Sequence, residues 1–253
     1  MKIRIGCCGW CVKGGKKEYC RMFETVEVQE TFYRLPRVET ARRWRDEMHP
    51  EFIFNMKAWQ VITHPPSSPT WRRSGLRISG SKSNRYGFLQ PTEENLKAWE
   101  KTLEVAEAIN ANVIVVQTPA SFNYSRENIE NIGGFFSTIR RGGSHIGWEP
   151  RGDWREHLDE VRNICMRQDI LHISDPFRCN NVSAHNIRYF RLHGIGGKEV
   201  NYSYRYTADD FKRLVDLLKA EKDRGVEEVF LMFNNVSMME DAMKFKIFLS
   251  SYF

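Results

Sequence analysis

Eight short apolar runs alternate with longer helical stretches along this chain, and this alternation limits its possible folds more than any other feature. Most of the runs are almost continuously apolar, which is typical of parallel strands covered on both faces. Strands that alternate with helices indicate βαβ units. We predict strands at residues 3–7, 25–29, 52–57, 113–117, 145–149, 170–174, 187–192 and 228–233.

Helical spacing of apolar residues fills the intervals between these runs. Residues 92–109 begin at Thr92, and Glu93 and Glu94 suit the positive end of a helix dipole. Residues 207–224 begin at Thr207, with Asp210 three positions later as in a capping box. We predict shorter helices at residues 38–48, 126–138, 154–167 and 238–248.

Eight strands connected by helices predict one (β/α)8 TIM-barrel-like domain over residues 1–253. An open doubly wound sheet is the alternative fold. No G-x-G-x-x-G and no G-x-x-x-x-G-K-[ST] follows the first strand, which counts against a nucleotide-binding form of that sheet.

Composition narrows the class of protein. The 253 residues are 41% hydrophobic, enough apolar surface to exclude a disordered chain. Lys and Arg number 38 against 32 Asp and Glu, so the net charge of +6 permits a polyanionic partner without requiring one. No apolar run is long enough to span a membrane, and the first residues lack the apolar stretch of a signal peptide. We therefore expect no membrane partner and a cytoplasmic location, and the sequence does not set the oligomeric state.

Four of the six cysteines, Cys7, Cys8, Cys11 and Cys20, lie near the start of the chain. Their spacing matches no usual iron–sulfur or zinc site. Adjacent residues of a strand point to opposite faces, so Cys7 and Cys8 would lie on different sides of the sheet. Buried thiols or an occasional disulfide are favoured over a metal cluster.

Residues 59–91 form the longest irregular segment and follow the third predicted strand. The segment carries His64, several prolines and five basic residues, with Trp71 and Tyr86 among them. In a barrel it would lie over the catalytic face, where such a loop is usually functional. The alternative is a solvated basic loop.

Ionisable residues mark several predicted strand ends, which converge at the mouth of a barrel. The candidate catalytic residues are Glu27, Lys57, Glu149 and His193. We expect Glu27 to pair with Lys57, and Glu149 with an arginine, because an unpaired buried charge is costly. The alternative is a charged network that only closes the barrel. The candidate binding residues are Trp10, Tyr33, His64, Gln117, Arg151, Arg191, Asn234 and Asn235; His64, Gln117 and the two asparagines could instead be structural.

Three chemistries fit these residues. In the first, arginines hold phosphates of nucleic acid or of a phosphorylated small molecule, aromatic side chains stack on bases, and one divalent metal ion assists hydrolysis. Its weak metal-ligand candidates are Glu149, Asp175 and His193. A non-catalytic barrel that binds nucleic acid or a small ligand would use the same cations. The second chemistry is Schiff-base or enolisation chemistry with Lys57 as nucleophile and Glu27 or Glu149 as base. The third is a glycosidase with Glu27 and Glu149 as its carboxylate pair.

Several sequence blocks, in this order along nearly the whole chain, resemble the YecE-like family, also called DUF72. They are IGCCGW at 5–10, TVEVQETFYRLP at 25–36, FNMKA at 54–58 with ITH at 62–64, QTPASF at 117–122, WEPR at 148–151 with Trp154, YFRLHG at 189–194 and FNN at 233–235. The resemblance implies a TIM-barrel-like fold similar to endonuclease IV-like barrels, and it implies no particular activity. Cys7-Cys8 stand where the family commonly has Thr-Ser, and Gln29-Glu30 where it commonly has Asn-Ser.

Overall fold

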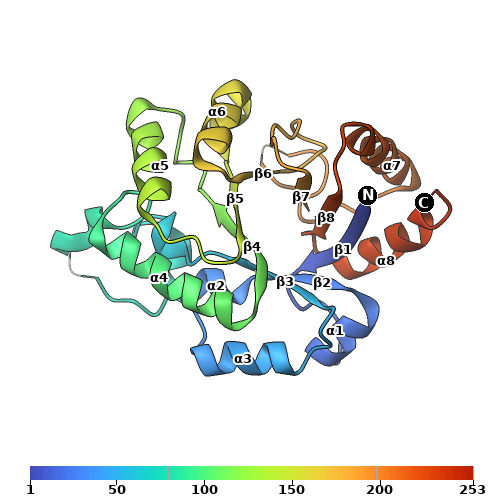
Figure 1. The fold of residues 1–253 in the computed structure, drawn as a ribbon, viewed down its shortest axis with the longest axis horizontal. Coiled ribbons are helices and arrows are strands. Elements are labelled where there is room, and N and C mark those ends of the chain that lie inside the picture. Colours follow the sequence, from blue (N-terminus) through green and yellow to red (C-terminus); the bar gives the residue numbers. More distant parts are fainter. Residues whose placement is uncertain (79, 198, 253) are drawn as a thin grey trace.

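The computed structural model describes residues 1–78, 80–197 and 199–252. Its eight strands pair in chain order, all in parallel, and the last pairs with the first to close a barrel (Figure 1). The predicted barrel is confirmed, and its strands lie within a few residues of the predicted bounds. The strands are β1 (Lys2–Cys8), β2 (Thr25–Val28), β3 (Ile53–Lys57), β4 (Ala111–Gln117), β5 (His145–Glu149), β6 (Leu171–Ser174), β7 (Ile187–Leu192) and β8 (Glu228–Phe233).

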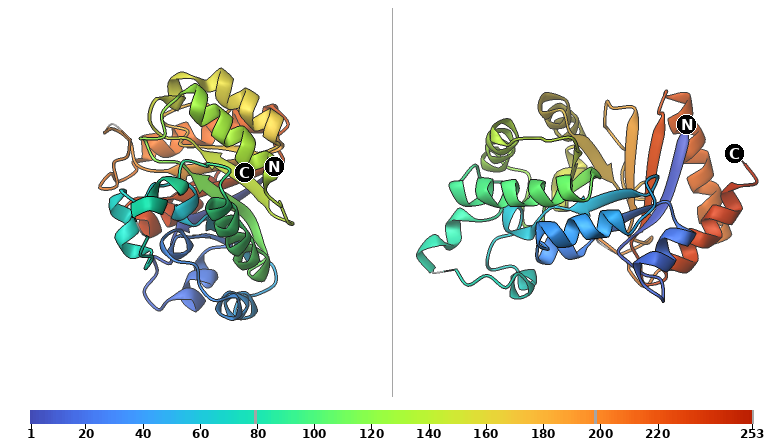
Figure 2. Two further views of the ribbon diagram at one scale, coloured as in Figure 1. Left: turned by 90° about the vertical axis from the view of Figure 1, so that its left-hand side faces the viewer. Right: turned by 60° about the horizontal axis from the view of Figure 1, so that its bottom comes forward.

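Helices surround the barrel (Figures 1 and 2). The connection from β6 to β7, residues 175–186, is described throughout and contains no helix, so the barrel is irregular there. Two short helices, α1 and α2, are too brief to show a helical period and were not predicted. The helices are α1 (Lys16–Met22), α2 (Glu30–Tyr33), α3 (Val38–Asp46), α4 (Glu93–Ala108), α5 (Arg126–Thr138), α6 (Leu158–Gln168), α7 (Ala208–Asp223) and α8 (Met238–Leu249).

The two predicted helix starts are confirmed. The Thr92 hydroxyl accepts a hydrogen bond from the Asn95 backbone N–H at the start of α4. At the start of α7, Thr207 and Asp210 form a full capping box. These contacts satisfy backbone N–H groups that have no partner within the helix.

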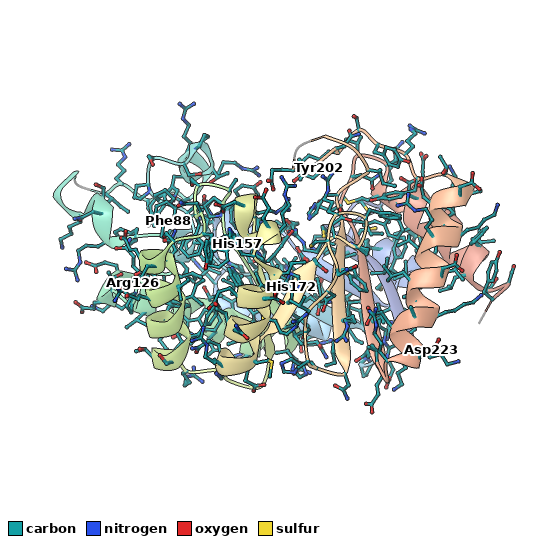
Figure 3. All side chains as sticks on the ribbon, turned by 90° about the horizontal axis from the view of Figure 1, so that it is seen from above. Phe88, Arg126, His157, His172, Tyr202 and Asp223 are labelled. Atoms are coloured by element: carbon teal, nitrogen blue, oxygen red, sulfur yellow. The ribbon has the colours of Figure 1, made fainter. Side chains whose placement is uncertain are left out.

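Side chains of each strand alternate between the barrel interior and the helix layer. In β7, Tyr189 belongs to the interior cluster, whereas Phe190 and Leu192 pack in the outer core. Cys7 and Cys8 likewise lie on opposite sides of β1, as expected. Side chains fill both the interior of the barrel and the space between its strands and the surrounding helices (Figure 3). This alternation directs Arg191, one position beyond Phe190, into the interior.

The described part of the segment after β3 contains short helices. It forms three 3-10 helices, η1 (Gln60–Ile62), η2 (Pro69–Arg73) and η3 (Gly80–Arg85). Trp71, which the sequence suggested as a surface for stacking bases, is 6% exposed, and its Nε1 donates to the His64 carbonyl, 2.8 Å away. The buried indole joins this part of the segment to the core, whereas all five basic residues of the segment are exposed.

All six cysteines are free thiols, and Cys7, Cys8 and Cys165 are buried. Among the helices of the described residues, none is long and apolar enough to cross a membrane.

Candidate active site

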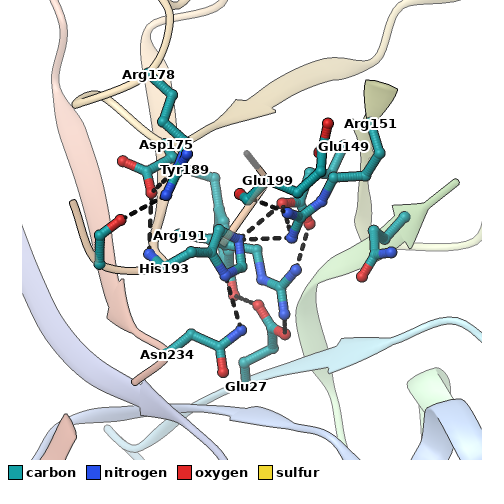
Figure 4. Close-up of polar contacts among 12 residues, drawn as sticks. Glu27, Glu149, Arg151, Asp175, Arg178, Tyr189, Arg191, His193, Glu199 and Asn234 are labelled. Carbon is teal, nitrogen blue, oxygen red and sulfur yellow. Dashed lines mark hydrogen bonds and ion pairs between the residues drawn. The ribbon is translucent and has the colours of Figure 1, made fainter. Parts of the chain in front are cut away.

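Two buried carboxylates share one guanidinium inside the barrel. Arg191 Nη2 lies 2.9 Å from Glu27 Oε1, and its Nη1 contacts Glu149 Oε2 (Figure 4). Burial alone would lower the pKa of Arg191, but the two carboxylates raise this pKa well above its usual value. The Tyr189 hydroxyl donates to Glu27 Oε2 over 2.9 Å. One buried guanidinium therefore contacts both Glu27 and Glu149.

A second group of contacts surrounds Glu149 Oε1. Arg151 Nη2 lies 2.8 Å away and His193 Nε2 2.9 Å away. The Asn234 amide nitrogen lies 3.1 Å from His193 Nδ1. The Asn234 amide nitrogen donates to Nδ1 and Glu149 accepts at Nε2, and both contacts favour a proton on Nε2. Arg151 Nη2, itself only a donor, lies 2.8 Å from the same Nε2 and acts against this tautomer. Burial, and then the Arg151 charge, lower the pKa of His193 to about 3, so its imidazole is neutral at pH 7.

Burial would raise the pKa of Glu149, yet the charges of Arg151 and Arg191 hold it well below its usual range. Glu149 therefore stays an ionised acceptor with both oxygens occupied. A general acid would need a raised pKa, so this carboxylate is poorly suited to that role.

Asp175 fixes the backbone after β7 rather than facing His193's ring. Its Oδ2 accepts from the His193 backbone N–H over 3.0 Å, and its Oδ1 from the Phe177 N–H, also over 3.0 Å. Arg178 Nε lies 3.4 Å from Oδ2, and Arg178 Nη2 donates to the Gly194 carbonyl over 2.7 Å. Burial raises the pKa of Asp175, and the two backbone hydrogen bonds act in the opposite direction.

Lys57, at the end of β3, does not pair with Glu27 as expected, because Arg191 occupies that carboxylate. The lysine is 7% exposed, and Nζ lies 3.8 Å from the centroid of the Phe32 ring. No described carboxylate forms an ion pair with it. Burial, and then the neighbouring Arg191 charge, lower its pKa to about 7. Lys57 can therefore lose its proton near neutral pH.

His64 also contacts the Phe32 ring. Its ring lies 5.0 Å from that of Phe32, edge to face, and its Nδ1 is 2.8 Å from the Thr63 hydroxyl. Burial, and then the Lys57 charge, lower the pKa of His64 to about 3. Around Phe32 the site therefore holds a lysine of low pKa and a neutral imidazole.

The structure brings together six of the predicted residues in one hydrogen-bonded network and places Lys57 and His64 near it. Four others lie apart. The Asn235 amide donates to Asp241 and to the Tyr204 carbonyl, so it anchors α8. Gln117 makes one 3.4 Å contact to the Thr118 carbonyl. Trp10 packs on Tyr19 and Phe52, and Tyr33 lies under the Arg73 guanidinium. The residues of the network are Glu27, Glu149, Arg151, Arg191, His193 and Asn234.

Three site residues escaped the sequence-based selection. Gln29 donates to Glu27 Oε1, Tyr189 donates to the other oxygen, and Arg178 supports Asp175. Tyr189 and Arg191 share a strand face, so the period of two could have identified Tyr189 once β7 was placed. Arg178 lies in the irregular β6–β7 connection, where no periodicity exists.

The donor set does not fit a divalent metal ion. Over the described residues, no group of three or more His, Cys, Asp and Glu side chains is placed to hold one. Of the three weak ligand candidates, Glu149 is bound by two arginines, Asp175 accepts backbone N–H groups, and His193 Nε2 faces Glu149.

The family model described as a protein of unknown function, DUF72, matches residues 4–250. A DUF72 family protein from Thermotoga maritima is 18% identical, with a TM-score of 0.70, and the match covers 99% of this chain and 100% of that one. A D-tagatose 3-epimerase-like protein is 17% identical, with a TM-score of 0.59 over 100% of this chain and 97% of that one. Endonuclease IV from Thermus thermophilus is 12% identical, with a TM-score of 0.58, and the match covers 98% of this chain and 99% of that one.

No curated protein sequence matches the chain. The structural likenesses confirm the barrel fold, and the family model covers almost every residue. The chain therefore belongs to the DUF72 family.

Proposed function

We propose that this barrel is an enzyme that acts on a small carbonyl compound, with Lys57 as its nucleophile. The observation that carries the proposal is a buried lysine at a strand end whose neighbouring carboxylates are already neutralised by arginines. An amine becomes nucleophilic at neutral pH when it is desolvated or lies beside another cation. Lys57 meets both conditions, and the amine of a structural lysine would instead be paired.

The chemistry balances without a co-reactant. The lone pair of the neutral Lys57 amine attacks the carbonyl carbon and gives a carbinolamine. Transfer of protons to the carbinolamine oxygen expels water and leaves an imine between Nζ and the former carbonyl carbon. The neutral imidazole of His64 contacts the same Phe32 ring as Lys57 and so lies beside the reacting amine.

The two competing enzyme chemistries fit the site less well. A paired-carboxylate glycosidase needs one carboxylic acid that holds a proton. Glu27 and Glu149 share Arg191, and the arginines hold the pKa of Glu149 well below its usual range, so Glu149 is unsuited to hold that proton. A metal-assisted phosphodiester hydrolase needs a set of ligands, and the described carboxylates near His193 point at arginines and backbone N–H groups instead.

The test is reductive trapping at pH 7.5. The protein is incubated with glycolaldehyde and sodium cyanoborohydride, which reduces an imine to a stable secondary amine, and peptides are mapped by mass spectrometry. We expect Lys57 to be modified far faster than the exposed Lys97. Lys101→Arg serves as the matched control and should leave this result unchanged. Modification of Lys57 no faster than of Lys97 would contradict the proposal.

A second candidate function, nucleic-acid binding, is favoured by a groove beside η1. Its free volume is about 440 Å³, Trp59 lies on its wall, and Arg34, Arg37 and Lys101 line it. Cations interleaved with an aromatic ring are typical of single-strand binding surfaces. End-labelled single- and double-stranded DNA and RNA, with Mg²⁺, Mn²⁺ or EDTA, would test binding and cleavage. Cleavage that Glu149→Ala abolishes would favour a nuclease, and salt-sensitive binding without cleavage a binding protein.

A further inference from the structure

Two thiols face each other at the carboxyl end of β1. Cys7 lies in the strand and is buried, whereas Cys11, just beyond the strand, is partly exposed. Gly9 turns the chain between them with a φ of +118°, a value that residues with a side chain rarely adopt, and its carbonyl accepts from the Cys11 N–H over 3.1 Å. Trp10 packs edge-on against Tyr19, with 5.2 Å between the ring centroids, and anchors this turn. The side chains of Cys7 and Cys11 are hydrogen-bonded to each other.

The surroundings of the two thiols give them different protonation states. Burial raises the pKa of Cys7 well above its usual value, so this thiol keeps its proton at neutral pH. The hydrogen bond from Cys7 lowers the pKa of Cys11, and burial acts in the opposite direction. The Cys7 sulfur also lies 3.5 Å from the Met238 carbonyl, which is a second acceptor for its proton. An ionised Cys11 is the stronger acceptor of the two because it carries a charge.

The other four cysteines lack this combination. Cys8 and Cys165 are buried, and burial raises the pKa of both thiols, to about 12 for Cys165. Cys179 is partly exposed, yet burial raises its pKa to about 11. Cys20 is also partly exposed, and its thiol donates to the Lys17 carbonyl over 3.2 Å. Cys11 is thus a partly exposed thiol with a second thiol at its side.

We propose that Cys11 and Cys7 form a site of oxidation by peroxides, which join the two residues in a disulfide bond. The thiolate is the reactive form of a cysteine, and Cys11 is the member of the pair that ionises and meets solvent. Its sulfur attacks one oxygen of hydrogen peroxide, and the O–O bond breaks. The departing hydroxide takes a proton from solvent and becomes water, which leaves a sulfenic acid on Cys11.

Cys7 completes the reaction. Its sulfur attacks the sulfur of Cys11 while the S–O bond breaks, and the departing hydroxide takes the Cys7 proton as a second molecule of water. The two thiols give up two electrons, and one peroxide is consumed. Because Cys7 is held against Cys11, this step is intramolecular and needs no thiol from solution. The site is separate from Lys57 and does not depend on the carbonyl chemistry proposed for that residue.

The experiment oxidises the whole, reduced protein with hydrogen peroxide at pH 7.5. Iodoacetamide then blocks the remaining thiols, and mass spectrometry examines the tryptic peptide 5–13, which contains Cys7, Cys8 and Cys11. We expect this peptide to lose two hydrogen atoms, to keep one thiol open to alkylation, and to regain both hydrogens with dithiothreitol. Cys8→Ser should form the same bond, which identifies its partners as Cys7 and Cys11. Cys20→Ser is the matched control and should change nothing.

Two further measurements separate the roles of the pair. Iodoacetamide should modify Cys11 at least about tenfold faster than Cys179, because their thiolate fractions differ by about a hundredfold and the more basic thiolate recovers part of this. With peroxide, Cys7→Ser should stop at a sulfenic acid on Cys11 that dimedone captures. Cys11→Ser should leave the peptide reduced.

Three results would overturn the proposal. Oxidation of Cys20 or Cys179 before peptide 5–13 would show that Cys11 is not the reactive thiol. A bond that Cys8→Ser abolishes would assign the disulfide to a different pair. A sulfenic acid on Cys11 that persists in the parent protein would show that Cys7 does not attack it.

Discussion

Arg191 and Glu27 form an ion pair of 2.9 Å inside the barrel, where their side chains are 1% and 0% exposed. The pair determines which charged side chains at the mouth of the barrel have an ion-pair partner. Because the same guanidinium also takes Glu149, one buried cation serves two carboxylates. Lys57 is left without a counter-ion, and burial then favours its neutral form.

Removal of the shared cation should unfold the barrel more readily. Arg191→Met leaves Glu27 and Glu149 buried with fewer partners, and breaking a buried pair in this way costs about 3–5 kcal/mol. Urea unfolding at pH 7 measures the loss. Arg4→Met is the control, because Arg4 is 23% exposed and its pairs with Glu24 and Glu228 are worth less. Equal losses in the two variants would mean that the Arg191 network contributes no more than a surface pair.

Lys57→Met should stabilise the protein at neutral and acid pH. The folded-state pKa of about 7 lies below the usual 10.5, so the unfolded chain binds a proton more readily between these values. The energetic cost of burying this lysine is therefore complete below pH 7 and disappears as the pH rises to about 10.5. We expect a gain on the order of 5 kcal/mol at pH 6 and none at pH 10.5, because each unit of the pKa difference corresponds to about 1.4 kcal/mol. Urea unfolding of both proteins at the two pH values measures it, and a pH-independent difference would show that Lys57 is not buried as a charge.

The free energy of unfolding should begin to fall at a pH well above the range in which carboxylates titrate. Burial lowers the pKa values of His64 and His193 to about 3 and of His172 to about 4, against 6.5 in the unfolded chain. The unfolded chain therefore binds more protons, and stability falls as the pH drops from about 6.5 toward 4. His172→Gln should reduce the slope of unfolding free energy against pH between 6 and 5. A stability that stays constant from pH 7 to pH 5 would contradict the neutral state of these rings.

Asn234 should fix the tautomer of His193. Its amide nitrogen donates to Nδ1 and so favours a proton on Nε2 toward Glu149, against the opposing effect of the Arg151 donor near the same Nε2. Asn234→Asp replaces this donor with an anionic acceptor, so the proton should move to Nδ1 and the pKa of His193 should rise. Nitrogen-15 chemical shifts of the imidazole report both changes. The same tautomer in Asn234→Asp and in the parent protein would show that Glu149 alone sets it.

The sequence predicted the elements whose signal is local. The strands showed as apolar runs, and the caps at Thr92 and Thr207 are contacts between residues three apart. The ends of β2, β5 and β7 supplied Glu27, Glu149 and His193 for the same reason, because a strand end can be placed from its apolar run. The choice of partner for Glu27 was not local. Tyr189, which donates to Glu27, is 162 residues away along the chain, and Arg191 lies on the same face of β7 as Tyr189. The predicted pairing of Glu27 with Lys57 was therefore wrong. Arg178 was missed because it lies in the β6–β7 connection, which has no periodic pattern of apolar residues.

The state of Lys57 is the central claim, and a titration tests it most directly. Carbon-13 labelling of the lysine side chains gives one Cε signal for each lysine, and Lys57→Arg assigns the one of interest. We predict one lysine that titrates near pH 7, three or more pH units below the exposed lysines, and its absence in Lys57→Arg. A protein in which every lysine titrates near the usual 10.5 would contradict the account, because Lys57 would then be a paired or solvated ammonium with no amine to offer a carbonyl group.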